Sequence, residues 1–195
     1  MPTGAPLDSP SGQLLSAVQK FKDLALSWHS ATYQPTPDSG EVTVKAMDLH
    51  ATNFSLWHHE DAVRRPGIDD HAVACTKRLI DALNAKRNST VEDIDELLLQ
   101  QVNAGENAPL HTETPGRIVD RLSVLALRIA HTNRPEQYAT ELAVLNEQYE
   151  DLFGGLQQLL THMHDGAIRV KLYRQFKSAT LQNECTLFEA TAPDR

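Results

Sequence analysis

Residues 49–61 read LHATNFSLWHHED, a segment with helical spacing in which polar residues occupy positions that a packed helix normally fills with apolar ones. At 3.6 residues per turn, one stripe of this helix runs through Leu49, Asn53, Leu56 and Glu60. Burying an unpaired polar group costs about 1–3 kcal/mol, and an unpaired charge costs more. We therefore expect neighbouring helices to satisfy Asn53 and Glu60 around a polar pocket inside the protein.

The partners of this helix are expected on the next helix along the chain. There the core stripe includes Leu83, Arg87 and Val91, so a guanidinium takes a core position. A carboxylate and a guanidinium on facing helices can form a bidentate pair, and we therefore expect Glu60 to bind Arg87. Buried pairs of this kind also fix helix register without any catalysis, so a purely structural network is an open alternative.

Helical periodicity broken by proline and glycine predicts an all-α fold, a single-domain bundle of about six helices. The expected domain covers residues 12–190 and follows a Pro-, Gly- and Ser-rich tail, residues 1–11, that we expect to be disordered. Thr114 and Pro115 suit the N-cap and the first position of one of these helices. The six helices are expected at about 12–30, 42–64, 69–102, 115–131, 135–163 and 167–187.

The composition limits the class of partner. A formal net charge of −8 argues against general binding to nucleic acids or anionic membranes, because both need a cationic face. No apolar run approaches the length of about 20 residues that spans a bilayer, and the first residues lack the pattern of a signal peptide. Cys75 and Cys185 have no metal-binding spacing. We therefore expect a cytoplasmic protein with neither a nucleic acid nor a membrane as its partner.

Distances along a helix limit which residues can contact the same ligand. A rise of 1.5 Å per residue separates His50 from Asp61 by about 16 Å, so both cannot contact one small ligand. We centre the site between the C-terminal half of the second expected helix and the third one, with the start of the fourth closing it. The residues expected to be catalytic are His58, Glu60, Asp61 and Asp120. The residues expected to bind substrate are His50, Asn53, Trp57, Arg64, Asn84, Arg87, Asn88 and Arg121.

The roles follow from side-chain chemistry. Glu60 suits general acid or base catalysis if it loses solvent, and His58 titrates near neutral pH and could carry a proton. Arg64, Arg87 and Arg121 suit binding of a phosphate or a carboxylate.

Four blocks of the sequence resemble a bacterial family known as domain of unknown function 4254. The blocks are LHATNFSLWHHEDAVRR (49–65), KRLIDALNAKRNSTVEDID (77–95), TPGRIVDRLSVLALRIAH (114–131) and YRQFK (173–177). They contain the acidic, amide and basic residues assigned above to the site. The resemblance implies an all-helical fold and a place in polysaccharide or secondary-metabolite biosynthesis, but it implies no particular activity.

Three functions are therefore open. The first is a small-molecule enzyme or ligand-binding protein that acts on an anionic metabolite and needs no cofactor. The second is a non-catalytic interaction module that forms a homodimer through its first or fifth helix. The third is a magnesium-dependent nucleotide pyrophosphohydrolase, because Glu92 and Asp95 have the i, i+3 spacing of its metal-binding element. No other metal site is expected, since H-E-x-x-H and E-x-x-H motifs are missing.

Overall fold

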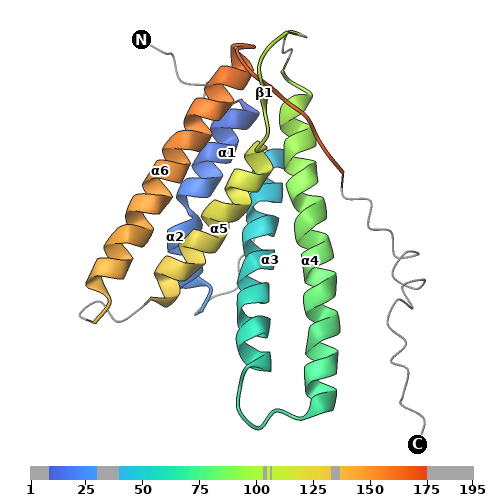
Figure 1. Ribbon diagram of the computed structural model, residues 1–195, viewed down its shortest axis with the longest axis vertical. Coiled ribbons are helices and arrows are strands. Elements are labelled where there is room, and N and C mark those ends of the chain that lie inside the picture. The colour runs from blue at the N-terminus through green and yellow to red at the C-terminus, as the bar shows by residue number, and fades with distance from the viewer. Residues whose placement is uncertain (1–8, 30–39, 103–104, 106, 133–136, 175–195) are drawn as a thin grey trace, which may run out of the picture.

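A computed structural model describes residues 9–29, 40–102, 105, 107–132 and 137–174. Within these residues the fold is an all-α bundle with one very small sheet, as the sequence predicts (Figure 1). The elements are α1 (Pro10–Gln19), α2 (Phe21–Ser27), α3 (Glu41–Val63), α4 (Asp70–Leu99), β1 (Leu110–His111), α5 (Pro115–His131), α6 (Ala139–His164) and β2 (Arg169–Val170).

Helix α5 lies at the centre of the packing. It contacts α2, α3, α4 and α6, while α3 and α4 lie side by side as a long hairpin (Figure 1). Each helix contributes to the core at least one side chain with no exposed surface. These side chains are Leu14, Phe21, Leu49, Ile94, Leu122 and Leu156. Their convergence explains why polar residues on the inner faces of α3, α4 and α5 must find partners in one another.

The start of α5 is fixed by its own sequence and by α4. Thr114 caps the helix by accepting a hydrogen bond from the Arg117 backbone N–H, and Pro115 takes the first position, as predicted. A methyl group on Gly116 would lie 2.5 Å from the Val91 carbonyl oxygen, so α5 can approach α4 this closely only through glycine. Asp95 completes the junction, because its Oδ1 accepts the Gly116 N–H at 2.7 Å.

The structure shows how far the Glu92–Asp95 pair could serve as a metal-binding element. The side chain of Asp95 is buried. Burial raises the pKa of Asp95 to about 6, although hydrogen bonds from Thr114 and Gly116 oppose the rise. One oxygen of the Glu92–Asp95 pair is thus committed to capping α5, and the pair does not present two free carboxylates to magnesium.

The first helix differs from the prediction at both ends. It begins at Pro10, two residues early, because Ser9 accepts the Gly12 N–H and proline suits the first turn. The single helix expected at 12–30 is two helices that break at Lys20, and α2 ends at Ser27. Residues 1–8 of the expected disordered tail lie outside the described residues.

The helix expected at 167–187 is wrong over its described part. Gly166, with φ of +67°, ends α6, and β2 then pairs in parallel with β1. Backbone and side chain of Arg169 hold this strand by donating to the carbonyls of Pro109 and Ala108, at 3.0 and 2.9 Å. Residues 175–187 lie outside the described residues. None of the described helices combines the length and the apolar character that crossing a membrane requires.

Candidate functional site

Asp120 on α5 is the centre of the buried polar groups. Arg87 on α4 holds its carboxylate with two hydrogen bonds, Nε to Oδ1 at 2.7 Å and Nη2 to Oδ2 at 2.5 Å. Asn53 on α3 donates to the same carboxylate at 2.9 Å. One buried acid therefore links three helices, and it satisfies Asn53 and Arg87, two of the three polar residues on the core stripes of α3 and α4.

The predicted pair between Glu60 and Arg87 is wrong. Glu60 lies 3.5 Å from Arg64 and 3.9 Å from Lys77, and about a third of its side chain is exposed. The prediction assumed that α3 and α4 satisfy each other across their own interface. Because α5 packs against both helices, its Asp120 reaches Arg87 instead.

A chain of hydrogen bonds continues from Asn53 into the core. The second N–H of its amide donates to Ser123 Oγ at 3.0 Å, and Ser123 Oγ lies 2.8 Å from His50 Nδ1. His50 Nε2 lies 3.0 Å from the Phe21 carbonyl oxygen, which can only accept. Nε2 therefore carries the proton, and Nδ1 accepts from the Ser123 hydroxyl. We call the set Arg87, Asp120, Asn53, Ser123 and His50 the polar chain.

The polar chain assigns His50 a structural role, and the expectation that it contacts a substrate is wrong. Its side chain has no exposed surface, and both ring nitrogens are used inside the protein. Burial lowers the pKa of His50 to about 4, so the ring is neutral at neutral pH. Asp120 is likewise buried and occupied by Arg87 and Asn53, which makes it a positioning group for Arg87 rather than a catalytic acid.

Seven of the predicted residues meet at one pocket of about 280 Å³ between α3, α4 and α5. We call this the acidic pocket, after Glu60 and Asp61. The seven residues are Asn53, Trp57, Glu60, Asp61, Arg64, Asn84 and Arg87. Because Asn53 and Arg87 also belong to the polar chain, the core network directly sets the shape of this pocket.

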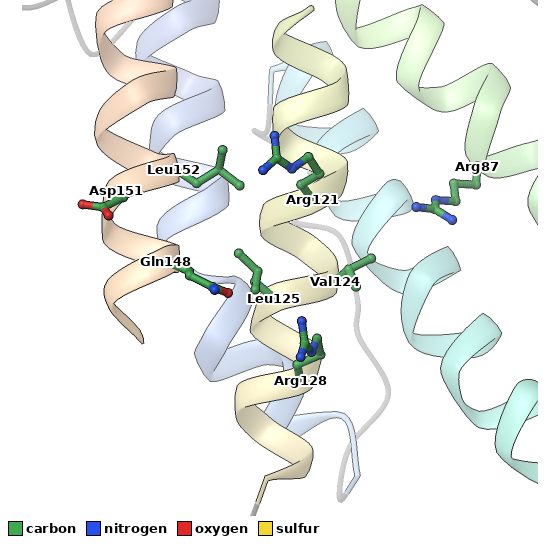
Figure 2. Close-up of a pocket in the computed structure, with 8 residues that line it drawn as sticks. All are labelled: Arg87, Arg121, Val124, Leu125, Arg128, Gln148, Asp151 and Leu152. Atoms are coloured by element: carbon green, nitrogen blue, oxygen red, sulfur yellow. The ribbon is translucent and has the colours of Figure 1, made fainter. Parts of the chain in front are cut away.

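A larger cavity of about 640 Å³ is also lined by Arg87 (Figure 2). Arg121 and Arg128 reach it from α5, while α6 contributes Gln148, Asp151 and Leu152. We call it the arginine cavity. Its size falls in the range of about 300–1,000 Å³ that is typical of small-molecule sites. Arg87 and Val124 line both spaces, so the two are neighbours.

The three arginines of this cavity differ in how they are paired. Arg87 is held by Asp120, and Arg121 donates to Glu113 at 2.8 Å in an exposed ion pair. Among the described residues, Arg128 makes no ion pair. The cavity therefore combines one fixed guanidinium, one loosely held guanidinium and one that forms no ion pair among the described residues.

Two further predicted residues, Asn88 and His58, lie outside both spaces. His58 turns away from Glu60, toward His29 and His131, with ring centroids 5.2 and 5.3 Å away. Trp57 does line the acidic pocket, but its indole ring stacks on His131 at 4.8 Å between centroids.

Two residues of the site, Ser123 and Arg128, were missed from the sequence although a spacing signal exists. Ser123 follows Asp120 by one helical turn, and Arg128 follows Arg121 by two turns, so each shares a face with a predicted residue. No spacing along one helix brings His29, His58 and His131 together, because His29 follows the end of α2 while His58 lies in α3 and His131 in α5.

The comparisons with known proteins identify a family without a function. The model of the family described as protein of unknown function (DUF4254) matches residues 44–172. This span contains the whole polar chain and all residues that line the acidic pocket and the arginine cavity. No curated protein and no solved structure matches the chain.

Proposed function

We propose a function for this chain, which belongs to the DUF4254 family of proteins of unknown function: it binds an anionic small molecule in the arginine cavity. The ligand class is a metabolite that carries a phosphate or a carboxylate group. The observation that carries the proposal is the convergence of Arg87, Arg121 and Arg128 on one cavity, in a protein whose net charge is −8.

The geometry of Arg87 supports this assignment. Its Nε and one N–H of Nη2 are used by Asp120, which leaves three of its five N–H groups for a ligand. The polar chain behind Asp120 fixes the guanidinium before any ligand arrives, and such preorganisation lowers the entropic cost of binding. Arg87 therefore orients the ligand through its remaining N–H groups and adds little net attraction, because Asp120 already compensates its positive charge.

Net attraction comes from the other two arginines. The ion pair between Arg121 and Glu113 is exposed, and pairs of this kind contribute little, so an anionic ligand can take the place of Glu113. Arg128 brings a positive charge that forms no ion pair among the described residues, although Asp151 lines the same cavity. Val124, Leu125 and Leu152 complete the walls, which favours a ligand with an apolar or neutral part beside its anionic group.

The acidic pocket supplies the groups for a reaction on that ligand. Glu60 and Asp61 line the pocket that shares Arg87 with the arginine cavity, and they provide carboxylates for general acid or base catalysis. The family resemblance supports a role in a bacterial pathway of polysaccharide or secondary-metabolite synthesis. Binding and catalysis are thus separate parts of the proposal, and binding can be tested alone.

The test is isothermal titration calorimetry of the full chain against inorganic pyrophosphate and a panel of sugar phosphates. We expect at least one of these probes to bind, and we expect Arg128→Gln to weaken that binding by about tenfold or more, as loss of one charge-assisted contact does. Arg117→Gln is the matched control, because Arg117 is exposed on α5 and lies outside the cavity. Failure of every probe to bind, or an equal loss in both variants, would overturn the proposal.

A further inference from the structure

Three histidines that are far apart in the sequence meet beside α3. His29 directly follows Trp28, the C-cap of α2, His58 lies in α3, and His131 is the last residue of α5. One ring nitrogen of each lies within 4.8 Å of the other two. We call this set the histidine cluster. It shares no residue with the polar chain.

The hydrogen bonds of two of these rings fix their protons. His29 Nδ1 lies 2.9 Å from the Ala25 carbonyl oxygen, and His131 Nδ1 lies 2.8 Å from the Leu127 carbonyl oxygen. A carbonyl oxygen only accepts, so both Nδ1 atoms are donors and the neutral rings carry their lone pairs on Nε2.

The two Nε2 atoms lie only 3.2 Å apart. With both protons on Nδ1, two lone pairs face each other and no hydrogen bond can form between the neutral rings. A cation between them removes the conflict, and it is either a proton or a metal ion. A backbone carbonyl that receives the far N–H of an imidazole is also the usual way in which proteins orient a metal-binding histidine.

His58 completes the set with a third unused nitrogen. Its Nε2 is buried and has no hydrogen-bond partner among the described residues, a state that normally costs about 1–3 kcal/mol. Burial, helped by the nearby His131 and His29 rings, lowers the pKa of His58 and so favours the neutral form that binds metals. Phe54 packs its ring edge-on against His29 and His58, which holds both in place.

We propose that His29, His58 and His131 bind a divalent transition metal ion, with Zn²⁺ the best match. Three imidazoles suit Zn²⁺ and its neighbours, whereas Mg²⁺ and Ca²⁺ take oxygen ligands. Bond lengths of about 2.0–2.1 Å place the nitrogens of a tetrahedral zinc site about 3.4 Å apart, close to the spacing of the His29 and His131 nitrogens. A shift of the third ring by about 1 Å closes the site.

Three protein ligands leave the fourth position of a tetrahedral ion open, which is the arrangement of catalytic rather than structural zinc. His131 and Trp57 also line a cavity of about 710 Å³ between α5 and α6. This cavity also shares Arg128 and Gln148 with the arginine cavity, so it borders both the arginine cavity and the histidine cluster. The metal site rests on the geometry of the three rings alone and does not depend on anion binding.

The test uses the full chain, freed of metal by a chelator and then titrated with Co²⁺ as a spectroscopic substitute for Zn²⁺. We expect one Co²⁺ per chain, the intense visible absorption of four-coordinate cobalt, and its displacement by Zn²⁺. His29→Gln and His131→Gln should each weaken binding by at least about 100-fold, since loss of even an outer-shell partner costs about 10–100-fold. His162→Gln, which changes an exposed histidine in the last turn of α6, should bind as the unmodified chain does.

Circular dichroism of each variant shows whether it folds, and His29→Gln is the decisive one because its side chain is exposed. Absence of Co²⁺ and Zn²⁺ binding, or binding that survives both variants, would overturn the site and assign the His29–His131 contact to a shared proton. Arg128→Gln should leave Co²⁺ binding unchanged. Loss of anion binding and loss of metal binding can therefore be told apart.

Discussion

Arg87 and Asp120 join α4 to α5 through two nearly parallel hydrogen bonds, and this pair is the outer end of a polar chain that reaches the carbonyl of Phe21. Each hydrogen bond of the polar chain has a fixed donor. Arg87 and Asn53 both donate to the Asp120 carboxylate. The Ser123 hydroxyl accepts from Asn53 and donates to Nδ1 of His50. Because the links depend on one another, removal of one member should leave its neighbours unsatisfied.

Replacement of Arg87 by methionine should destabilise the protein. Removing one partner of a fully buried ion pair costs about 3–5 kcal/mol, and because the Arg87 side chain is 31% exposed we expect about 2–3 kcal/mol. Urea denaturation followed by circular dichroism measures the free energy of unfolding. Glu113→Gln breaks the exposed pair with Arg121 and should cost less than about 1 kcal/mol. Equal effects of the two changes would contradict a special role for Arg87.

Replacement of Ser123 by alanine should also be costly, despite the small change in volume. Both the Nδ1 of His50 and one N–H of Asn53 lose their partner inside the core, so we expect a loss of about 1–3 kcal/mol. Ser55→Ala on α3 is the control, since that side chain is half-buried and lies outside the polar chain. The melting temperatures of the two variants are compared by thermal unfolding. A Ser123 variant as stable as the control would show that the hydrogen bonds of the polar chain do not depend on one another.

Replacement of Gly116 by alanine should separate α5 from α4. The added methyl group would meet the backbone carbonyl of Val91 at 2.5 Å, and neither helix can move without disturbing the Asp95 cap. Overpacking of this kind typically costs about 1–3 kcal/mol.

Gly155→Ala on α6 gives the opposite expectation and serves as the matched change. Nothing lies within 4 Å of the added methyl group, so better helix propensity should stabilise the protein by about 0.5–1 kcal/mol. Differential scanning calorimetry should therefore show melting temperatures that shift in opposite directions. A shift in the same direction for both variants would contradict the close contact at Gly116.

Two buried groups should give opposing contributions to stability in acid. The pKa of His50 falls on folding from 6.5 to about 4, so its contribution is present above pH 6.5 and is lost as pH falls. The pKa of Asp95 rises on folding from 3.8 to about 6, so its contribution is present below pH 3.8 and is lost as pH rises. Between about pH 4 and 6 the two effects partly cancel.

Replacement of Asp95 by asparagine should reveal the contribution of His50. The amide oxygen can still accept the Gly116 N–H, while the cost of burying a charge disappears. We expect the variant to gain about 2–3 kcal/mol over the unmodified chain at pH 7 and to lose that advantage as pH falls toward 4. Urea denaturation across this pH range measures the difference. Asp93→Asn, at the partly exposed pair with Lys45, should show no such trend.

Local rules were sufficient for much of the fold. Helical periodicity and proline breaks predicted α3 to within a residue or two, and Thr114 with Pro115 predicted the start of α5. The same rules predicted a helix after Ala167, where pairing with residues some 60 positions earlier in the chain determines a strand instead. The break at Lys20 likewise had no proline or glycine to mark it.

The site shows where sequence reasoning stops. Spacing identified Asn53, Glu60 and Arg87 as polar residues on core faces and brought them to one pocket. It could not choose between Glu60 and Asp120 as the partner of Arg87, because that choice depends on the packing of a third helix. The histidine cluster depends on the ends of two helices and the middle of another, which no spacing along one helix describes.

The tie between β2 and the segment before α5 has a mechanical consequence for the arginine cavity. Arg169 anchors the C-terminal end of α6 to Pro109 and Ala108, while Gln148 and Asp151 line the cavity nearer the other end. Any outward motion of α6 would therefore be smallest at this anchor and largest at the N-terminal end of the helix. The hydrogen bond from Tyr149 to the Val18 carbonyl, which ties α6 to α1, would oppose that motion.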